Sequence, residues 1–334
     1  MKSLIKKLVE TPGPSGYETQ IRQVVRAEIE PLAEEIRVDA LGNLIARKGH
    51  LKPGGKRIML AAHMDEIGII ATHIDENGFV RFTTLGGVRA YNCPGGRVRF
   101  LNGANGVIGI EALEKPGETP AFEQMFIDLG VRGRKDCPVR VGEVAVFERP
   151  LLDLGQRLVA KAMDDRVGVA VLIETLRQLG DTPHELYFVV SAQEEVGVRG
   201  ATTAAYGVDP ELGLAVDVTA TGDTPKGIKM EVGLGKGPAI KVRDSLMLAD
   251  PRLVKWMVET AEKSGIPYQL EILERGGTDA RAIQLTRAGV PAGCLSIPCR
   301  YIHSPSEMVD YQDVQDAVRL LLALISQPIF LEQS

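Results

Sequence analysis

The sequence predicts an α/β fold in which a mainly parallel sheet, sandwiched by helices, carries an inserted small all-β barrel domain. Stretches with helical periodicity alternate with short apolar runs at both ends of the 334-residue chain, and such alternation is typical of a parallel sheet covered on both faces. The middle of the chain contains short β runs split by turn residues, a pattern typical of a barrel or sandwich. Hydrophobic residues make up 44% of the chain, which is enough to build a large buried core.

The first 66 residues are expected to form two helices followed by two strands. Apolar residues fall on one helical face of the opening MKSLIKKLVE, and again between residues 21 and 29. The segment TPGPSG at 11–16 separates the two helices, because proline and glycine interrupt helical structure. Strand-like runs follow near 37–46 and 57–62.

Residues 67–155 are expected to form the inserted β-barrel domain. This segment carries the β runs FVRFTTL, RVRFL, GVIGIEAL, FIDLG and EVAVFE. Because helices and strands alternate on both sides of it, 1–66 and 156–334 together are expected to form one discontinuous domain. In the second piece we predict helices at 169–179, 252–264 and 314–325, and strands at 185–190, 213–217 and 290–297.

Composition and charge exclude several classes of protein. The formal net charge is -5, which argues against a nucleic-acid partner because phosphate recognition requires clustered positive charge. No run approaches the roughly 20 apolar residues of a membrane span, and the charged N-terminal helix lacks the apolar core of a signal peptide. Four cysteines without a CxxC pair indicate reduced thiols. We therefore expect a cytoplasmic protein without a nucleic-acid or membrane partner.

Polar residues gather where the predicted strands end. In open α/β sheets, ligands bind beyond the carboxyl ends of the strands, so the residues after each strand are candidates for a site. Four strand ends and one helix start each supply a histidine or a carboxylate, namely His63-Met64-Asp65, Glu194-Glu195, Asp217, His303 and Asp164-Asp165.

Charge crowding at this rim indicates bound cations. The rim is expected to hold the carboxylates of Asp164, Glu194, Glu195 and Asp217. Two like charges about 5 Å apart cost about 3 kcal/mol at an effective dielectric constant near 20, so the six pairs approach about 20 kcal/mol. That exceeds the typical net stability of about 5–15 kcal/mol, so either cations or retained protons must offset it. With two histidines present, a transition metal such as zinc is the natural counter-ion, whereas a magnesium or calcium site would not need imidazoles.

Some members of the set also have a plain structural interpretation. Glu194-Glu195 alone is typical of a solvated surface pair, and Asp164-Asp165 is typical of a cap for the helix that follows. His63 suits a buried histidine bonded to backbone. The spacing His63-x-Asp65 fits something more specific, an imidazole ligand whose second N–H is held by a carboxylate.

Each of the remaining candidates also has a structural interpretation besides the functional one. Asp217 suits a turn at a strand end, and His303 suits a loop. The Gly-Thr-Asp turn at 277–279 begins a helix and either caps it or lines a site. The sequence contains neither a GxSxG nucleophile elbow nor an HExxH zinc motif. The other histidines are interpreted as surface residues, namely His50, His73 and His184.

Taken in order, the set resembles the co-catalytic metallopeptidases. More closely, the chain resembles metallopeptidase family forty-two, the tetrahedral (TET) aminopeptidases, which include glutamyl aminopeptidases. The resemblance covers essentially the whole chain, including TPGPSGYE, GNLIA, AKAMDDRVG, the Gly-Thr-Asp-Ala stretch at 277–280 and IHSPSE. It implies a zinc-peptidase-like fold whose β insertion is a dimerisation domain, and a homo-oligomer in which dimers assemble into a tetrahedral dodecamer.

The resemblance also implies two divalent metal ions per subunit, zinc or cobalt. One ion would be held by His63 and Asp217, and the other by Glu195 and His303. Asp164 would bridge both ions, and its peptide bond to the next residue would be cis.

The activity that follows is that of a dinuclear metal-dependent aminopeptidase, which removes N-terminal residues from short peptides. A metal-bridging hydroxide would attack the scissile carbonyl, and Glu194 would act as general base. Asp65 would orient the imidazole of His63. Two alternatives stay open. One is a polysaccharide-cleaving glycoside hydrolase of the endoglucanase type, which uses paired carboxylates, and the other is a non-catalytic scaffold that assembles through its β insertion. The preferred N-terminal residue is not predicted.

Overall fold

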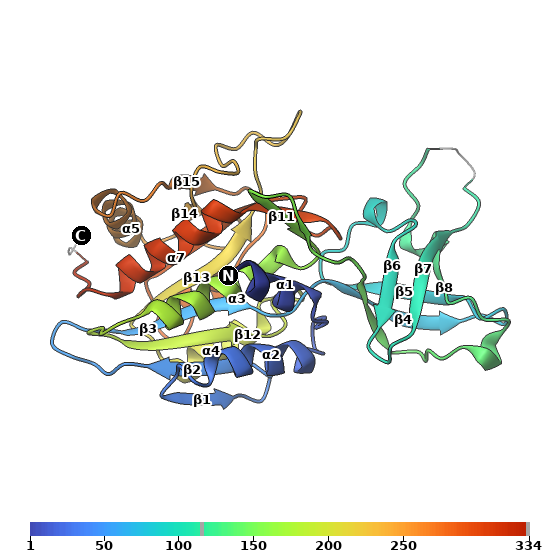
Figure 1. Ribbon diagram of the computed structural model, residues 1–334, viewed down its shortest axis with the longest axis horizontal. Coiled ribbons are helices and arrows are strands. Elements are labelled where there is room, and N and C mark those ends of the chain that lie inside the picture. Colours follow the sequence, from blue (N-terminus) through green and yellow to red (C-terminus); the bar gives the residue numbers. More distant parts are fainter. Residues whose placement is uncertain (114–116, 332–334) are drawn as a thin grey trace.

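The computed structural model describes residues 1–113 and 117–331. Figure 1 shows an α/β body from which a β barrel projects to the right. The predicted fold class is confirmed, because a large sheet lies between layers of helices and a closed barrel forms a separate unit. Within the described ranges, no helix combines the length and the apolar character needed to cross a membrane.

The large sheet runs in the order β1-β2-β12-β3-β13-β16-β17-β11-β10, and β14 and β15 extend it from β16. Strands β12, β3, β13 and β16 are mutually parallel, so their carboxyl ends share one edge. The strands are β1 (Glu35–Val38), β2 (Leu44–Lys48), β3 (Arg57–His63), β10 (Leu152–Asp153), β11 (Arg157–Ala160), β12 (Glu185–Ser191), β13 (Leu212–Thr219), β14 (Ala239–Arg243), β15 (Gln269–Ile272), β16 (Ala292–Arg300) and β17 (Glu307–Asp310).

Two layers of helices cover the sheet because side chains alternate between its two faces. In β3, Ile58 and Leu60 pack with α1, α2, α3, α5 and α7, whereas Met59 and Ala61 pack with α4 and α6. The helices are α1 (Lys2–Glu10), α2 (Thr19–Ile29), α3 (Met163–Gln178), α4 (Arg199–Val208), α5 (Pro251–Lys263), α6 (Asp279–Gln284) and α7 (Tyr311–Ile325).

The barrel has its own apolar core, which includes Phe82, Phe100 and Ile127. Its strands close in the order β4-β5-β8-β7-β6-β9. They are β4 (Gly68–Ile74), β5 (Val80–Leu85), β6 (Arg97–Phe100), β7 (Asn105–Ile110), β8 (Met125–Asp128) and β9 (Val144–Phe147), accompanied by the short helices η1 (Ala90–Asn92), η2 (Phe122–Gln124) and η3 (Arg134–Asp136). All six strands lie inside the expected insertion at 67–155, but β10 already pairs with β11 in the large sheet.

Two elements differ from the sequence prediction. The run at 37–46 is not one strand, because it turns between β1 and β2. The Asp39 carboxylate accepts hydrogen bonds of 3.0 Å from the backbone N–H groups of Leu41, Gly42 and Asn43, a local arrangement that favours a turn over a continuous strand. Helix α3 starts at Met163, but the backbone angles of Asp164 and Asp165 are not helical, so its regular turns begin after this pair and still earlier than the predicted residue 169.

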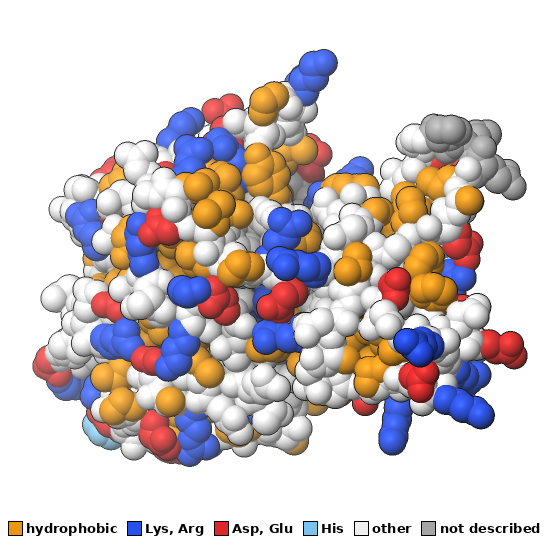
Figure 2. Space-filling model, turned by 45° about the vertical axis from the view of Figure 1, so that its right-hand side comes forward, with side chains coloured by type: hydrophobic (Ala, Val, Ile, Leu, Met, Phe, Trp, Pro, Cys, Tyr) orange, Lys and Arg blue, Asp and Glu red, His pale blue; other side chains and the backbone are white. Residues whose placement is uncertain are grey.

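Charged side chains of both signs are interspersed over the face shown in Figure 2, with apolar side chains between them. This distribution matches the small formal net charge of -5. The chemistry of the molecule is therefore better sought in local clusters of charge than in one extended field.

Candidate active site

The predicted site residues lie together at the carboxyl edge of the parallel strands. The shared edge follows from the order of the sheet, because β3 lies between β12 and β13, and β16 lies next to β13. Each residue occupies the end of one element: His63 ends β3 and Asp65 follows it, Glu194 and Glu195 follow β12, Asp217 lies near the end of β13, His303 follows β16, and Asp164 lies in the first turn of α3.

Two groups of potential metal ligands share Asp164. His63, Asp164 and Asp217 form one triad, and Asp164, Glu195 and His303 form the other, with the ligand atoms of each triad within 4.8 Å of one another. In the first, His63 Nε2 lies 3.0 Å from Asp164 Oδ1 and 3.9 Å from Asp217 Oδ1. In the second, His303 Nε2 lies 3.4 Å from Asp164 Oδ2 and 3.2 Å from Glu195 Oε2. The two oxygens of Asp164 therefore face different imidazoles.

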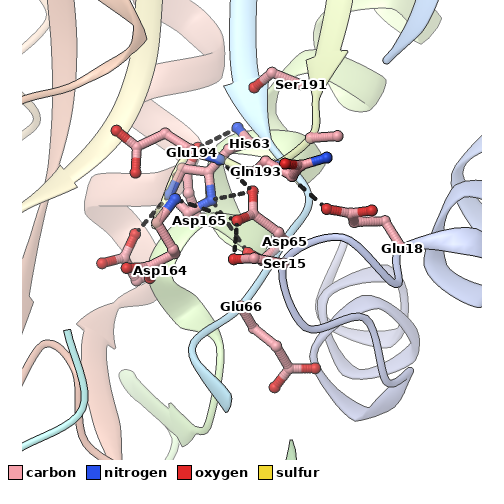
Figure 3. A network of polar contacts seen from close by, with 12 residues as sticks. Ser15, Glu18, His63, Asp65, Glu66, Asp164, Asp165, Ser191, Gln193 and Glu194 are labelled. Atoms are coloured by element: carbon pink, nitrogen blue, oxygen red, sulfur yellow. Dashed lines mark hydrogen bonds and ion pairs between the residues drawn. The ribbon is translucent and has the colours of Figure 1, made fainter. Parts of the chain in front are cut away.

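Asp65 links the first imidazole to the Glu194-Glu195 segment. Its Oδ1 accepts a hydrogen bond of 2.9 Å from the Glu194 N–H, and its Oδ2 accepts one of 3.2 Å from the Glu195 N–H. His63 Nδ1 lies 3.1 Å from the Asp65 carbonyl oxygen and 3.5 Å from its Oδ1. Burial opposes ionisation, but hydrogen bonds from His63 and Ser15 lower the pKa of Asp65. Asp65 is therefore a charged anchor inside the site (Figure 3).

The loop between α1 and α2 reaches the same network. The Ser15 hydroxyl donates a hydrogen bond of 2.6 Å to Asp65 Oδ2. Nearby, Glu18 Oε1 accepts a hydrogen bond of 3.2 Å from the Gln193 N–H, just before the Glu194-Glu195 pair. The TPGPSG segment, which the sequence marks as a helix break, thus also positions the residues after β12.

The Asp164–Asp165 peptide bond is cis. Asp164 has an extended backbone conformation inside the first turn of α3. Asp165 fulfils the capping interpretation, because its Oδ1 accepts a hydrogen bond of 3.1 Å from the Gly168 N–H. Its Oδ2 accepts one of 3.2 Å from the His63 N–H. Asp165 therefore caps the helix and ties it to β3, while Asp164 faces the two histidines.

Glu307 is a buried residue of the site to which the sequence reasoning gave no role. It lies in β17 with 1% of its surface exposed. Its Oε2 accepts a hydrogen bond of 2.9 Å from the Asp164 N–H, and its Oε1 accepts one of 2.8 Å from the His303 N–H. The IHSPSE motif contained the residue, but no spacing rule shows that a glutamate will bind two distant backbone N–H groups.

The carboxylates of the site raise one another's cost of ionisation. Burial raises the pKa of Asp217 well above its usual value; the His63 charge opposes the shift, and the Asp164 charge adds to it. Burial also raises the pKa of Glu194 well above its usual value. In Asp164, burial is outweighed by hydrogen bonds with the two histidines, which lower its pKa. Carboxylates crowded around two imidazoles favour a divalent cation.

One buried oxygen atom also indicates that the site suits a bound cation. Among the described residues, Glu195 Oε1 has no hydrogen-bond partner. A buried carboxylate oxygen without a donor is costly, and a cation held by Glu195 and His303 would satisfy it. Imidazole nitrogens and carboxylate oxygens are ligands that zinc and cobalt accept.

Glu194 and Asp65 are predicted site carboxylates that belong to neither triad, and of these two Glu194 faces the cavity. Its side chain lines the cavity above the two triads. In Figure 3 the carboxylates of Glu194 and Asp164 extend to the same side, away from Ser15. A carboxylate beside the triads, but outside them, is suited to proton transfer.

The cavity over the two triads has a volume of about 450 Å³ and is open to the surface. Its lining includes a loop of the barrel, and glycines allow that loop to approach closely. A Cβ added at Gly87 would lie 2.3 Å from His303 Nδ1, and one at Gly86 would lie 3.0 Å from the Glu195 Cβ. The barrel therefore contributes to the wall of the site as well as forming a separate unit.

Two secondary candidates are also resolved. The Thr278 side chain accepts a hydrogen bond from the Ala280 N–H and caps α6, while Gly277 lines the cavity, so the 277–279 turn has both roles. The interpretation of His184 as a surface residue was wrong. It is fully buried, with Nε2 lying 2.8 Å from the Gln327 carbonyl oxygen.

Comparison with known proteins identifies the family. The model of the M42 glutamyl aminopeptidase family matches residues 42–320. The chain belongs to this family. It is therefore an aminopeptidase, a hydrolase that acts on peptide bonds, and the resemblance found in the sequence is confirmed. M42 peptidases depend on metal, and the two triads supply groups that could hold it.

The family assignment extends over nearly the whole chain. A putative aminopeptidase of Acetivibrio thermocellus is 46% identical over 97% of this chain and 98% of its own. A lysyl aminopeptidase of Pyrococcus furiosus is 37% identical over 97% of this chain and 96% of its own. The structure of an aminopeptidase from Desulfurococcus kamchatkensis superposes with a TM-score of 0.94 at 40% identity, covering 97% of this chain and 94% of that one.

Proposed function

We propose that this M42 aminopeptidase uses two divalent ions, zinc or cobalt, to release N-terminal residues from short peptides. One ion would be held by His63 and Asp217, the other by Glu195 and His303, with Asp164 shared between them. The observation that carries the proposal is the position of Asp164, whose two carboxylate oxygens face different histidines at 3.0 and 3.4 Å.

When bound, a pair of such ions lowers the pKa of a water molecule and polarises the scissile carbonyl. Glu194 takes the proton from the attacking water and delivers it to the leaving amine, because its carboxylate lines the cavity without belonging to a triad. Asp65 keeps the His63 ring in place and anchors the Glu194 backbone through the contact of 2.9 Å.

The test combines metal binding with turnover. Titration of metal-free protein with zinc or cobalt is expected to saturate at two ions per chain. Glu194→Gln should still bind two ions while kcat for an aminoacyl reporter falls about 10²–10⁴-fold, and Asp164→Asn should weaken both sites. Glu76→Gln, exposed on the barrel, is the matched control. Normal turnover by Glu194→Gln would reject its role as base, and saturation at one ion would reject the dinuclear centre.

A glycoside hydrolase is the second candidate, because one solved neighbour is named an endoglucanase. That Thermotoga maritima structure superposes with a TM-score of 0.82 at 32% identity. Paired carboxylates suffice for glycoside cleavage, so that chemistry leaves His63 and His303 without a role. Cleavage of a cellulose reporter that persists in chelator would favour it. A purely structural scaffold would instead hydrolyse no aminoacyl reporter with metal supplied.

The barrel is proposed to be the dimerisation domain of a tetrahedral dodecamer. A Pyrococcus horikoshii TET1 peptidase, described as able to assemble into a tetrahedron or a large octahedral shell, superposes with a TM-score of 0.89 at 34% identity. Barrel residues Tyr91 and Val141 are 59% and 60% exposed, which leaves apolar surface for such contacts. Light scattering that finds only monomers at micromolar concentration would reject this assembly.

We also propose a cytoplasmic location. The four cysteines are free thiols, as is usual in a reducing compartment. Cell fractionation that recovers the protein outside the cytoplasm would overturn the proposal.

A further inference from the structure

The charge of the cavity points to the kind of peptide that it accepts, an inference that rests on the proposed function. Four carboxylates line the cavity, those of Asp164, Glu194, Glu195 and Asp217. Two divalent ions would balance these four negative charges. Among the described lining residues, the remaining side chains with a permanent charge are Arg89 and Arg275. Among the charges that line the loaded cavity, those of the two arginines would therefore be left without a counter-charge.

Arg89 reaches the cavity from the barrel. It lies two residues after Gly87, whose backbone lies so close to the His303 ring that a Cβ would be 2.3 Å from Nδ1. The loop therefore lies directly against the second triad. The Arg89 side chain is exposed and donates a hydrogen bond of 2.8 Å to the Tyr91 hydroxyl. It forms no ion pair with a described residue, so its charge remains available.

Arg275 reaches the cavity from the α/β body, in the loop between β15 and α6. Its exposed side chain has neither a hydrogen bond nor an ion pair within the described part of the protein. The lining beside it is apolar or backbone, contributed by Leu246, Leu273 and Gly277. An anionic group entering here would meet a guanidinium and no competing carboxylate outside the proposed metal centre.

We propose that Arg89 and Arg275 recognise a carboxylate of the peptide substrate. The planar guanidinium binds a carboxylate through two parallel hydrogen bonds, and partial enclosure strengthens the attraction. A lysyl or arginyl side chain would meet positive charge at these arginines, and the lining carboxylate outside the triads, that of Glu194, is reserved for proton transfer in the proposed function. The carboxylate could belong to an acidic N-terminal residue or to the free C-terminus of a very short peptide. Both sources share the same chemistry.

The first experiment compares glutamyl, leucyl and lysyl reporters that have no C-terminal carboxylate. If the N-terminal side chain is the ligand, kcat/KM for the glutamyl reporter should exceed that for the lysyl reporter about 10-fold or more. Arg275→Gln, Arg89→Gln or both should lower this ratio by a similar factor, with a smaller change for the leucyl reporter. Arg37→Gln on β1 and Arg132→Gln on the barrel, both exposed and outside the cavity, should preserve the ratio.

The second experiment compares Leu-Gly with its C-terminal amide. If the C-terminus is the ligand, the free acid should be cleaved about 10-fold faster, and the arginine variants should remove that difference. Either preference, with its loss in the variants, supports carboxylate recognition. Equal rates in both comparisons, a preference for the lysyl reporter, or arginine variants that match the wild type would overturn it. If the protein hydrolysed none of these substrates, the proposed function would be rejected instead, because the centre itself would be inactive.

Discussion

The carboxylate of Glu307 accepts a hydrogen bond of 2.9 Å from the backbone N–H of Asp164. The other oxygen of the same carboxylate accepts one of 2.8 Å from the His303 N–H. Glu307 therefore fixes the relative position of a shared carboxylate and an imidazole that are supplied by segments far apart in the sequence. Because both acceptor oxygens are used, an amide cannot replace this carboxylate.

Glu307→Gln is expected to lower zinc affinity at the Asp164–Glu195–His303 triad about 10–100-fold, the usual cost of losing a residue that orients metal ligands. The amide nitrogen would face one of the two N–H donors and leave it unpaired. Competition titration with a zinc chelator measures the two affinities. Circular dichroism and Glu76→Gln control for general damage. A folded Glu307→Gln protein with two normal zinc affinities would contradict this role.

Gly87→Ala should disturb the same triad from the barrel side. The added Cβ would lie 2.3 Å from His303 Nδ1, which is too close for an undisturbed ring, so the imidazole or the loop must shift. We expect kcat to fall about 10-fold or more, since small misplacements at a reacting centre are costly. Gly180→Ala, where an added Cβ meets no atom within 4 Å, is the control. Equal activity of the two variants would show that the loop yields freely.

Asp313 should make stability depend on pH. Burial raises its pKa from 3.8 to about 6, although hydrogen bonds from the Gly235 and Gly237 N–H groups oppose the shift, and the charges of Asp310 and Asp316 add to it. The folded state therefore keeps a proton that the unfolded chain has lost, so this stabilisation is complete below pH 4 and disappears as pH rises through 6. It amounts to at most about 3 kcal/mol.

Asp313→Asn removes this proton uptake. Between pH 4 and 7, the free energy of unfolding of the wild type should therefore fall relative to that of the variant by up to about 3 kcal/mol. Urea titrations at several pH values measure both curves. A difference in unfolding free energy that is the same at every pH reflects the lost hydrogen-bond acceptor. The test is therefore whether the two free energies change differently with pH. Parallel curves would show that Asp313 does not titrate in this range.

The four cysteines should react at different rates. Cys93, Cys294 and Cys299 are buried, whereas Cys137 is partly exposed. Burial raises the pKa of Cys93 to about 11, which suppresses the reactive thiolate. At pH 8, iodoacetamide should label Cys137 first, as peptide mass spectrometry would reveal, and Cys137→Ser should abolish the fast phase. Labelling of Cys93 at the same rate would contradict this order.

The sequence determined the fold class, because hydrophobic periodicity reports directly which face of each element is buried. In β3, Ile58 and Leu60 pack into one apolar core and Met59 packs into the other. A strand that is buried on both faces is apolar at every position, so it can be recognised in the sequence as an unbroken apolar run. The positions of Asp217 at the end of one such strand and of His303 after another pointed to one edge of a sheet. The turn at Asp39 could also have been predicted, since aspartate before glycine and asparagine is a turn signal.

Tertiary structure decided how these groups meet. The order β12-β3-β13-β16 does not follow the chain, so sequence spacing could not show that Asp164 has one oxygen toward each histidine. The roles of Glu307 and Ser15 were equally hidden, because a side chain bonded to a distant backbone or carboxylate leaves no periodic trace. The sequence thus pointed to the residues that are proposed to carry the chemistry, and the crossing of the chain between strands decided which atoms of those residues face one another.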